Sequence, residues 1–321
     1  MKDAKSSLNF NDLTPLKEIV RTNWNGELIK NELIKLKNEL DTIIYAVGDY
    51  GSDIRKGLRL AGIKHIHDIT HRIALTLERI YKNDAEYIEF TKQMSRMRSQ
   101  YSQTKIAHII PPKQRTKSRY QNIKTISDWG INILNFLNNA KKGKEDEIIE
   151  KLKWVKKHQL FIEELSEINH KICQIEKITK TYGLTKTTAH KAKEIIRKLS
   201  IKSMRAKRIA VDLEEYFHLT INLLPNSTNI LCTSDIIESA FGKYKNYLSN
   251  NPMAGITDLA LCISAFTCNL TQSEIKEALE STTMNDITKW VQKNIGMTLL
   301  KKRRKIFLVN QKNGVKNNFQ K

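Results

Sequence analysis

Asp49 is the first residue whose position suits chemistry. It directly follows a short, apolar and β-branched run at residues 42–48, which predicts a buried strand. Ligands of α/β sheets gather at the carboxyl ends of strands, and hard divalent cations prefer carboxylate oxygens. Asp49 is therefore a candidate metal ligand, and the alternative is an ordinary turn residue.

Glu238 is the second candidate carboxylate. It lies in the first turns of a helix that the sequence predicts from about residue 235. Asp235 lies three residues earlier and shares a helix face with it. Lys243 and Lys245 follow on the same helix, where their charges could hold phosphates. The alternative is an acidic residue that stabilises the helix dipole.

A histidine-rich segment, HIHDITH at residues 65–71, is the third feature. Histidines at this spacing could bind a metal, but no cysteine or carboxylate nearby completes a zinc set. His65, His67 and His71 fit equally well as hydrogen-bonded polar residues at a strand-to-helix corner. We prefer that structural interpretation, because the residues alone do not connect the segment to Asp49.

The scaffold for these side chains begins with an α/β region. Residues 42–48 and 64–68 predict two buried strands, and each precedes a helix, at about 53–60 and 70–81. A helix over 25–40 precedes them, and 16–20 predicts one more strand. Alternating strands and helices indicate an α/β arrangement for the first 80 residues.

The remainder of the chain predicts helices almost throughout. From about residue 84 to 224, apolar residues recur at three- and four-residue steps, and only 12 Gly and 5 Pro interrupt the whole chain. Thr233 or Ser234 would cap the helix of Glu238, and further helices are expected over 256–266 and 273–295. Residues 182–191 resemble the entry to a DNA recognition helix, but we prefer a solvated helix because no helix-turn-helix partner is clear.

Composition points to a polyanionic partner. The 55 Lys and Arg residues exceed the 34 Asp and Glu residues, giving a net charge of +21, and nucleic acid is the commonest partner of such basic chains. Compositional drift in an AT-rich gene is the alternative. A 40% hydrophobic and 28% charged composition argues against a disordered tail and a membrane protein. Four cysteines without a CxxC pair indicate free thiols in a reducing cytoplasm.

Together, the motifs resemble the catalytic domain of bacterial insertion-sequence transposases of the DDE type, which has a ribonuclease-H-like fold. The order is a strand ending in Asp49, a strand followed by Asp68-x-x-His71, a long helical stretch, and a helix carrying Glu238. Mutator-like and hAT transposases share this order most closely, and the likeness covers about residues 10–270. It implies that Asp49 is the second catalytic Asp and Glu238 the final Glu, and that both bind Mg²⁺ or Mn²⁺. Asp68 and His71 would match the motif that follows the second Asp.

The resemblance also implies a domain organisation. The fold class is α/β plus mostly α, with a partial ribonuclease-H-like sheet, a large all-helical insertion and C-terminal helices. We expect the α/β region at 1–83 and the insertion at 84–228, from which Arg115, Lys117 and Arg119 would face DNA. Residues 229–300 would carry the helix of Glu238 and C-terminal helices that pack on the α/β region. A basic flexible tail would occupy 301–321.

The first catalytic Asp of the family has no clear counterpart, because Asp3, Asp12 and Asp41 do not follow convincing buried strands. We therefore expect an N-terminally truncated transposase with little strand-transfer activity alone, unless an N-terminal partner acts in trans. Its partners would be double-stranded DNA of transposon ends and target and, when active, further copies of itself. It would be cytoplasmic and nucleoid-associated, with no membrane contact. The alternatives are a non-catalytic basic helical DNA-binding protein and a structural helical protein without DNA affinity.

Overall fold

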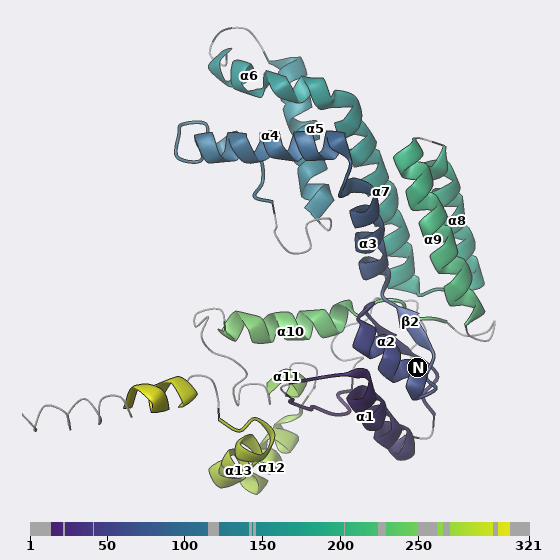
Figure 1. Cartoon of the computed structure of the whole chain (residues 1–321), viewed down its shortest axis with the longest axis vertical. Helices are drawn as coiled ribbons and strands as arrows, with labels where there is room; N and C mark the ends of the chain where they lie inside the picture. Colours follow the sequence, from purple (N-terminus) through teal and green to yellow (C-terminus); the bar gives the residue numbers. More distant parts are fainter. Residues whose placement is uncertain are drawn as a thin grey trace, which may run out of the picture.

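The computed structural model describes residues 14–21, 23–40, 42–114, 122–140, 143, 146–201, 203–223, 229–248, 262–265, 270–297 and 301–308. In these ranges the chain is mostly helical, with one small parallel sheet of two strands (Figure 1). The predicted class, α/β plus mostly α, is confirmed at this level.

The sheet joins two strands through one helix. Strand β1 (Ala46–Gly48) pairs in parallel with β2 (His65–His67), and helix α2 (Ser52–Leu60) connects them. In the register, Ala46 lies beside His65 and Gly48 beside His67. The two predicted strands and the helix between them are confirmed. Because the strands are parallel and in register, the residues that follow them emerge at the same edge of the sheet.

The predicted strand at 16–20 is wrong, since residues 14–21 have no regular secondary structure. This segment is held by charges instead of a backbone ladder. Lys17 and Arg21 form ion pairs of 3.3 and 3.2 Å with Glu32, which is buried on helix α1 (Gly26–Glu39). Lys17 and Arg21 thus attach this segment to α1.

Helices α1 and α2 pack closely because Gly57 has no side chain. A Cβ atom on Gly57 would lie 2.5 Å from Cγ2 of Ile29, well inside van der Waals contact. Asn25 caps α1 by accepting a hydrogen bond of 3.0 Å from the amide of Leu28. This helix pair lies beside the sheet in Figure 1 and fixes the helix that crosses from β1 to β2.

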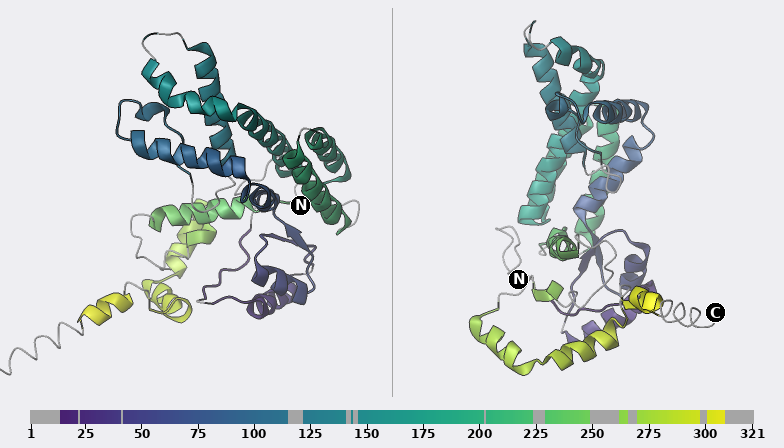
Figure 2. Two further views of the ribbon diagram at one scale, coloured as in Figure 1. Left: turned by 45° about the horizontal axis from the view of Figure 1, so that its top comes forward. Right: turned by 90° about the vertical axis from the view of Figure 1, so that its left-hand side faces the viewer.

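A long helical part follows β2, as the apolar periodicity predicts. It lies above the sheet in Figure 1, Figure 2 shows it in two further views, and its buried core includes Ile66 of β2. Its helices are α3 (Ile69–Tyr81), α4 (Ala85–Tyr101), η2 (Ala107–Ile109), α5 (Ile123–Asn139), α6 (Asp146–Leu152), η4 (Lys153–His158), α7 (Gln159–Tyr182), α8 (Lys186–Ser200) and α9 (Met204–Asn222).

Aromatic side chains form the centre of this helical part. Phe90 is fully buried, and its ring centroid lies 5.8 Å from those of Trp154 and Phe161. Trp129 packs at 6.2 Å from Trp154. Tilted and edge-on ring pairs at these spacings stabilise a core beyond the apolar area that they bury. Trp129 and Trp154 are half-buried and pack against this core.

Within this helical part, four residues form an ion-pair network centred on Arg205 of α9. The guanidinium lies 2.8 Å from Asp84, 3.1 Å from Glu86 and 2.7 Å from Glu164. Asp84 also caps α4 by accepting from the amide of Tyr87. Arg205 therefore joins the start of α4 to α7 and α9. Burial acts to lower the pKa of Arg205, but its acidic partners outweigh burial, so that the pKa is raised.

Among the described residues after 234, the labelled helices are α10 (Asp235–Leu248), α11 (Cys262–Ala265), α12 (Gln272–Ser281) and α13 (Met284–Asn294). The predicted helix over 273–295 is thus two helices, because Thr283 starts α13 with a capping box. Within the helix predicted over 256–266, only 262–265 belong to the described residues, and they are helical. Residues 301–308 of the predicted tail are helical too, and 309–321 lie outside the described residues.

Across the described ranges, no helix has the length and apolar character that crossing a bilayer requires.

Replacing Arg205 tests the network that joins α4, α7 and α9. Arg205→Met leaves Asp84 and Glu164, each with an 18% exposed side chain, without their cation. We expect the free energy of unfolding to fall by about 3 kcal/mol, because a partly buried carboxylate then loses its counter-charge. Urea denaturation measures this loss. Arg208→Met, at an exposed position on the same helix, is the control and should change stability by less than about 0.5 kcal/mol.

Candidate functional site

Asp49 follows the last residue of β1, where the sequence predicts it. Its Oδ1 atom accepts a hydrogen bond of 2.8 Å from the amide of Gly51, which turns the chain into α2. The side chain is half-buried at the edge of the sheet. The structure therefore gives Asp49 a turn-forming contact, at the strand end where a ligand of an α/β sheet would lie.

Asp68 follows the last residue of β2 and is fully buried. One carboxylate oxygen caps α3 by accepting from the amide of His71 at 3.0 Å. The other accepts from Ser234 twice, from its amide at 2.6 Å and from its hydroxyl at 2.8 Å. Asp68 thus joins the end of β2 to residues that lie immediately before α10.

The charge of Asp68 is stabilised by these donors. Burial alone raises the pKa of a carboxyl group. At Asp68 the hydrogen bonds from the backbone of His71 and from the backbone and hydroxyl of Ser234 outweigh burial, so that its pKa is lowered. Asp68 is therefore an anion at neutral pH, with its hydrogen-bonding capacity used inside the protein.

His71 brings Glu238 to the same place. Its Nδ1 atom lies 3.4 Å from Oδ1 of Asp68 and 3.6 Å from Oε1 of Glu238. The Glu238 side chain is 54% exposed and the His71 side chain 35% exposed. Asp68, His71 and Glu238, which the family resemblance selects from opposite ends of the helical stretch, are thus neighbours in the structure.

The segment at 230–235, which we name the strap, leads the chain into α10. Ile230 forms an antiparallel bridge with Leu184, and the amide of Leu231 donates to the hydroxyl of Tyr45 at 2.8 Å. The carbonyl of Cys232 accepts from the amide of Ile69 at 2.8 Å. These bonds attach the strap to the sheet region on one side and to the α7–α8 connection on the other.

Cys232 fixes the middle of the strap in the interior. Its side chain is fully buried, and its Sγ atom donates a weak hydrogen bond of 3.8 Å to the carbonyl of Thr179. Burial, with the nearby charge of Asp68, raises the pKa of the Cys232 thiol to about 12. The thiol is therefore neutral at physiological pH, and its position suits packing better than nucleophilic chemistry.

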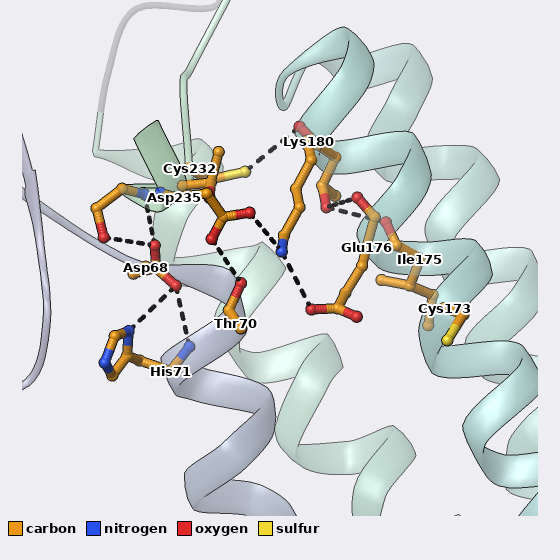
Figure 3. A network of polar contacts seen from close by, with 12 residues as sticks. Asp68, Thr70, His71, Cys173, Ile175, Glu176, Lys180, Cys232 and Asp235 are labelled. Atoms are coloured by element: carbon orange, nitrogen blue, oxygen red, sulfur yellow. Dashed lines mark hydrogen bonds and ion pairs between the residues drawn. The ribbon is translucent and has the colours of Figure 1, made fainter. Parts of the chain in front are cut away.

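Lys180 of α7 connects the helical part to α10 (Figure 3). Its ammonium lies 2.7 Å from Asp235, the first residue of α10, and 3.5 Å from Glu176. Burial raises the pKa of Glu176. For Lys180, burial acts to lower the pKa, but the bond to Asp235 and the charge of Glu176 outweigh it, so that the pKa is raised. The lysine stays charged and holds both carboxylates.

The contacts of Lys180 and Ser234 are the part of the site that the sequence does not predict. Lys180 is one lysine among many on a predicted helix. Ser234 is predicted as an N-cap, yet its hydroxyl donates to Asp68, while Thr233 Oγ1 accepts from the amide of Asp235 at 3.2 Å. The helix-capping pattern at 233–235 predicts that a helix starts at this segment, but it does not predict that Ser234 contacts Asp68.

His65 and His67 lie on β2 itself. The ring of Tyr50 stacks on that of His67 with centroids 3.9 Å apart, and the two histidine rings are 4.2 Å apart. Burial, with the charge of His65, lowers the pKa of His67 to about 4. Both side chains are half-buried at the strand-to-helix corner, but among the described residues His65 Nε2 and His67 Nδ1 are buried without a hydrogen-bond partner, so the interpretation of these histidines as fully hydrogen-bonded polar residues is not confirmed.

The predicted DNA-contacting residues divide into two sets. Lys243 and Lys245 lie on α10, beyond Glu238, and their side chains are exposed. Arg115, Lys117 and Arg119 lie outside the described residues.

The carboxylates of Asp49 and Glu238 have the oxygen chemistry that a hard cation needs. Within the described ranges, however, no three His, Cys, Asp or Glu side chains are grouped so as to hold a metal ion. Comparison with known proteins supplies no further guide, since no family model, curated protein or solved structure matches the chain.

Asp68→Asn tests the junction between β2 and the strap. At pH 7 we expect a loss of about 2 kcal/mol in the free energy of unfolding, because charge-assisted hydrogen bonds become neutral ones. The pKa of Asp68 in the folded protein lies below the ordinary 3.8. The stabilisation of the fold by the Asp68 charge is therefore complete at pH values above 3.8, and it is lost as the pH falls through the folded-state pKa. The difference between the two proteins should therefore shrink below about pH 4.

Urea denaturation of both proteins at neutral pH and at about pH 3.5 measures this difference. A difference that is equal at both pH values would contradict a role for the charge of Asp68.

Proposed function

We propose that this chain is a DNA-binding protein of the DDE transposase type, with a ribonuclease-H-like sheet edge as its site. The support comes first from connectivity. A parallel β1–α2–β2 unit ends in Asp49 and Asp68, helices α3 to α9 follow, and α10 then carries Glu238. This is the order of strands, helical insertion and Glu-bearing helix that the resemblance implies.

One observation carries the proposal: α10 begins at the end of β2. Ser234 bonds to Asp68, and Glu238 lies 3.6 Å from His71, although the residue numbers of these pairs differ by 166 and 167. A catalytic site whose residues lie on both sides of a helical insertion requires that the chain after the insertion comes back to the same edge of the sheet. If Glu238 had no role in such a site, its position beside the Asp68-x-x-His71 motif would have no explanation.

The residues divide into those that would face substrate and those that position them. In the proposed role, Asp49 and Glu238 would hold Mg²⁺ or Mn²⁺, which supplies Lewis-acid activation of the groups that attack and leave phosphorus. The fit is partial, because the donor type and the exposure of Glu238 suit this role while the described residues supply no three-residue group. Asp68 stays ionised and orients His71, and His71 in turn lies against Glu238.

A non-catalytic DNA-binding protein is the second candidate. The net charge of +21 favours it as much as it favours a transposase, because phosphate contacts need only lysine and arginine. The two proposals share DNA as partner and differ in whether Asp49 and Glu238 act through a metal ion.

Metal-dependent DNA binding distinguishes the two candidates. We expect Mn²⁺ to strengthen binding of a labelled duplex about tenfold over binding in EDTA, which corresponds to about 1.4 kcal/mol, because a bound cation would offset the repulsion between these carboxylates and the DNA phosphates. Asp49→Asn and Glu238→Gln should each abolish this gain. Fluorescence anisotropy at constant ionic strength measures the affinities.

Glu214→Gln, which removes one exposed negative charge on α9, is the matched control and should keep the Mn²⁺ effect. Duplex binding with no metal effect in the wild-type protein would favour the non-catalytic candidate. Absence of duplex binding at low salt would refute both.

A further inference from the structure

Helix α8 presents a basic face to solvent. Lys186, His190, Lys193 and Arg197 occur at steps of four, three and four residues, so they line one side of the helix. Lys191 and Lys198 are exposed on a second side of the helix, about 120° around its axis from this line. The opposite side is buried in the helical part through Ala189, Ala192, Ile196 and Leu199. We name Lys186, Lys191, Lys193 and Lys198 the α8 lysines.

The α8 lysines differ from many other lysines of the protein in their partners. Lys30, Lys35 and Lys151 each form an ion pair with a glutamate on their own helix. Within the described ranges, none of the α8 lysines has a carboxylate within ion-pair distance, and Glu194 is the single acidic residue of α8. Their charge is therefore available to a partner outside the chain.

The basic face starts next to the candidate site. Leu184, two residues before α8, forms the bridge to Ile230 at the start of the strap, and the strap leads into α10 and Glu238. From there α8 runs alongside α9 (Figure 1). At 1.5 Å per residue, the line from Lys186 to Arg197 is about 17 Å long. Duplex DNA carries one charge per ~1.7 Å of its axis, so several phosphates lie within this length.

We propose that the α8 lysines bind the phosphate backbone of the DNA duplex whose phosphodiester lies at the Glu238 edge. The inference rests on the proposed function and names the surface that positions its substrate. The α8 lysines neutralise phosphates without reading bases, because flexible ammonium groups on the exposed sides of the helix make point-charge contacts. Thr185 supports the first of them by starting α8 with a capping box.

The test replaces three α8 lysines together, as Lys186→Gln, Lys193→Gln and Lys198→Gln in one protein. Duplex affinity is measured against salt concentration by fluorescence anisotropy in EDTA. Each lost phosphate contact lowers the slope of log K against log salt by ~0.9, so we expect a slope shallower by about 2.7 and an affinity at least about tenfold weaker at low salt. The control removes the same charge from η4 as Lys153→Gln, Lys156→Gln and Lys157→Gln, and should keep the wild-type slope.

The outcomes separate the inference from the proposed function. If the wild-type protein binds duplex DNA and the α8 and control variants share one slope, the inference is wrong and the proposed function stands. If the wild-type protein shows no salt-dependent duplex binding, the proposed function fails. Tighter binding of single-stranded RNA or of anionic lipid vesicles than of duplex DNA, lost in the α8 variant, would also overturn the assignment. Should the triple variant prove unfolded by circular dichroism, Lys186→Gln alone should lower the slope by about one.

Discussion

The buried carboxylate of Asp68 is the interaction on which the candidate site depends. It is fully buried and accepts from the amide of His71 and from both donors of Ser234 at 2.6 to 3.0 Å. A buried anion is tolerated only where such donors surround it. Because the donors come from the start of α3 and from the strap, Asp68 requires both segments to meet at the end of β2. Glu238 follows within one turn of α10, so its place near His71 is a consequence of this junction.

Lys180 gives the junction a second anchor, from the helical part. It pairs with Asp235 at 2.7 Å and with Glu176 at 3.5 Å, so the longest helix, α7, and the first residue of α10 share one cation. The strap also bridges to Leu184 beyond the end of α7. A displacement of α7 would therefore act on Asp235, three residues from Glu238. The helical part and the sheet edge are in this way mechanically connected at the candidate site.

The sequence predicts the elements well and their long-range contacts poorly. Helical periodicity and β-branched runs locate α1 to α3 and both strands. A strand end selects Asp49 as a candidate position, and the family resemblance selects Asp68. The strand at 16–20 is wrong, because Lys17 forms an ion pair with Glu32 and the segment pairs with no strand. The partners of Ser234 and Lys180 could not be predicted, since no local pattern specifies which of many lysines or serines meets a carboxylate more than fifty residues away.

Hydrogen exchange at the strap tests the central role of Asp68 most directly. The amide of Ser234 donates to Asp68 and that of Ile69 to the carbonyl of Cys232. If the account is correct, both amides exchange slowly in the wild-type protein. In an Asp68→Ala protein they exchange at least about tenfold faster, while the amides of α5 keep their protection. Equal protection of the Ser234 amide in the two proteins would contradict the claim that Asp68 holds α10 at the edge of the sheet.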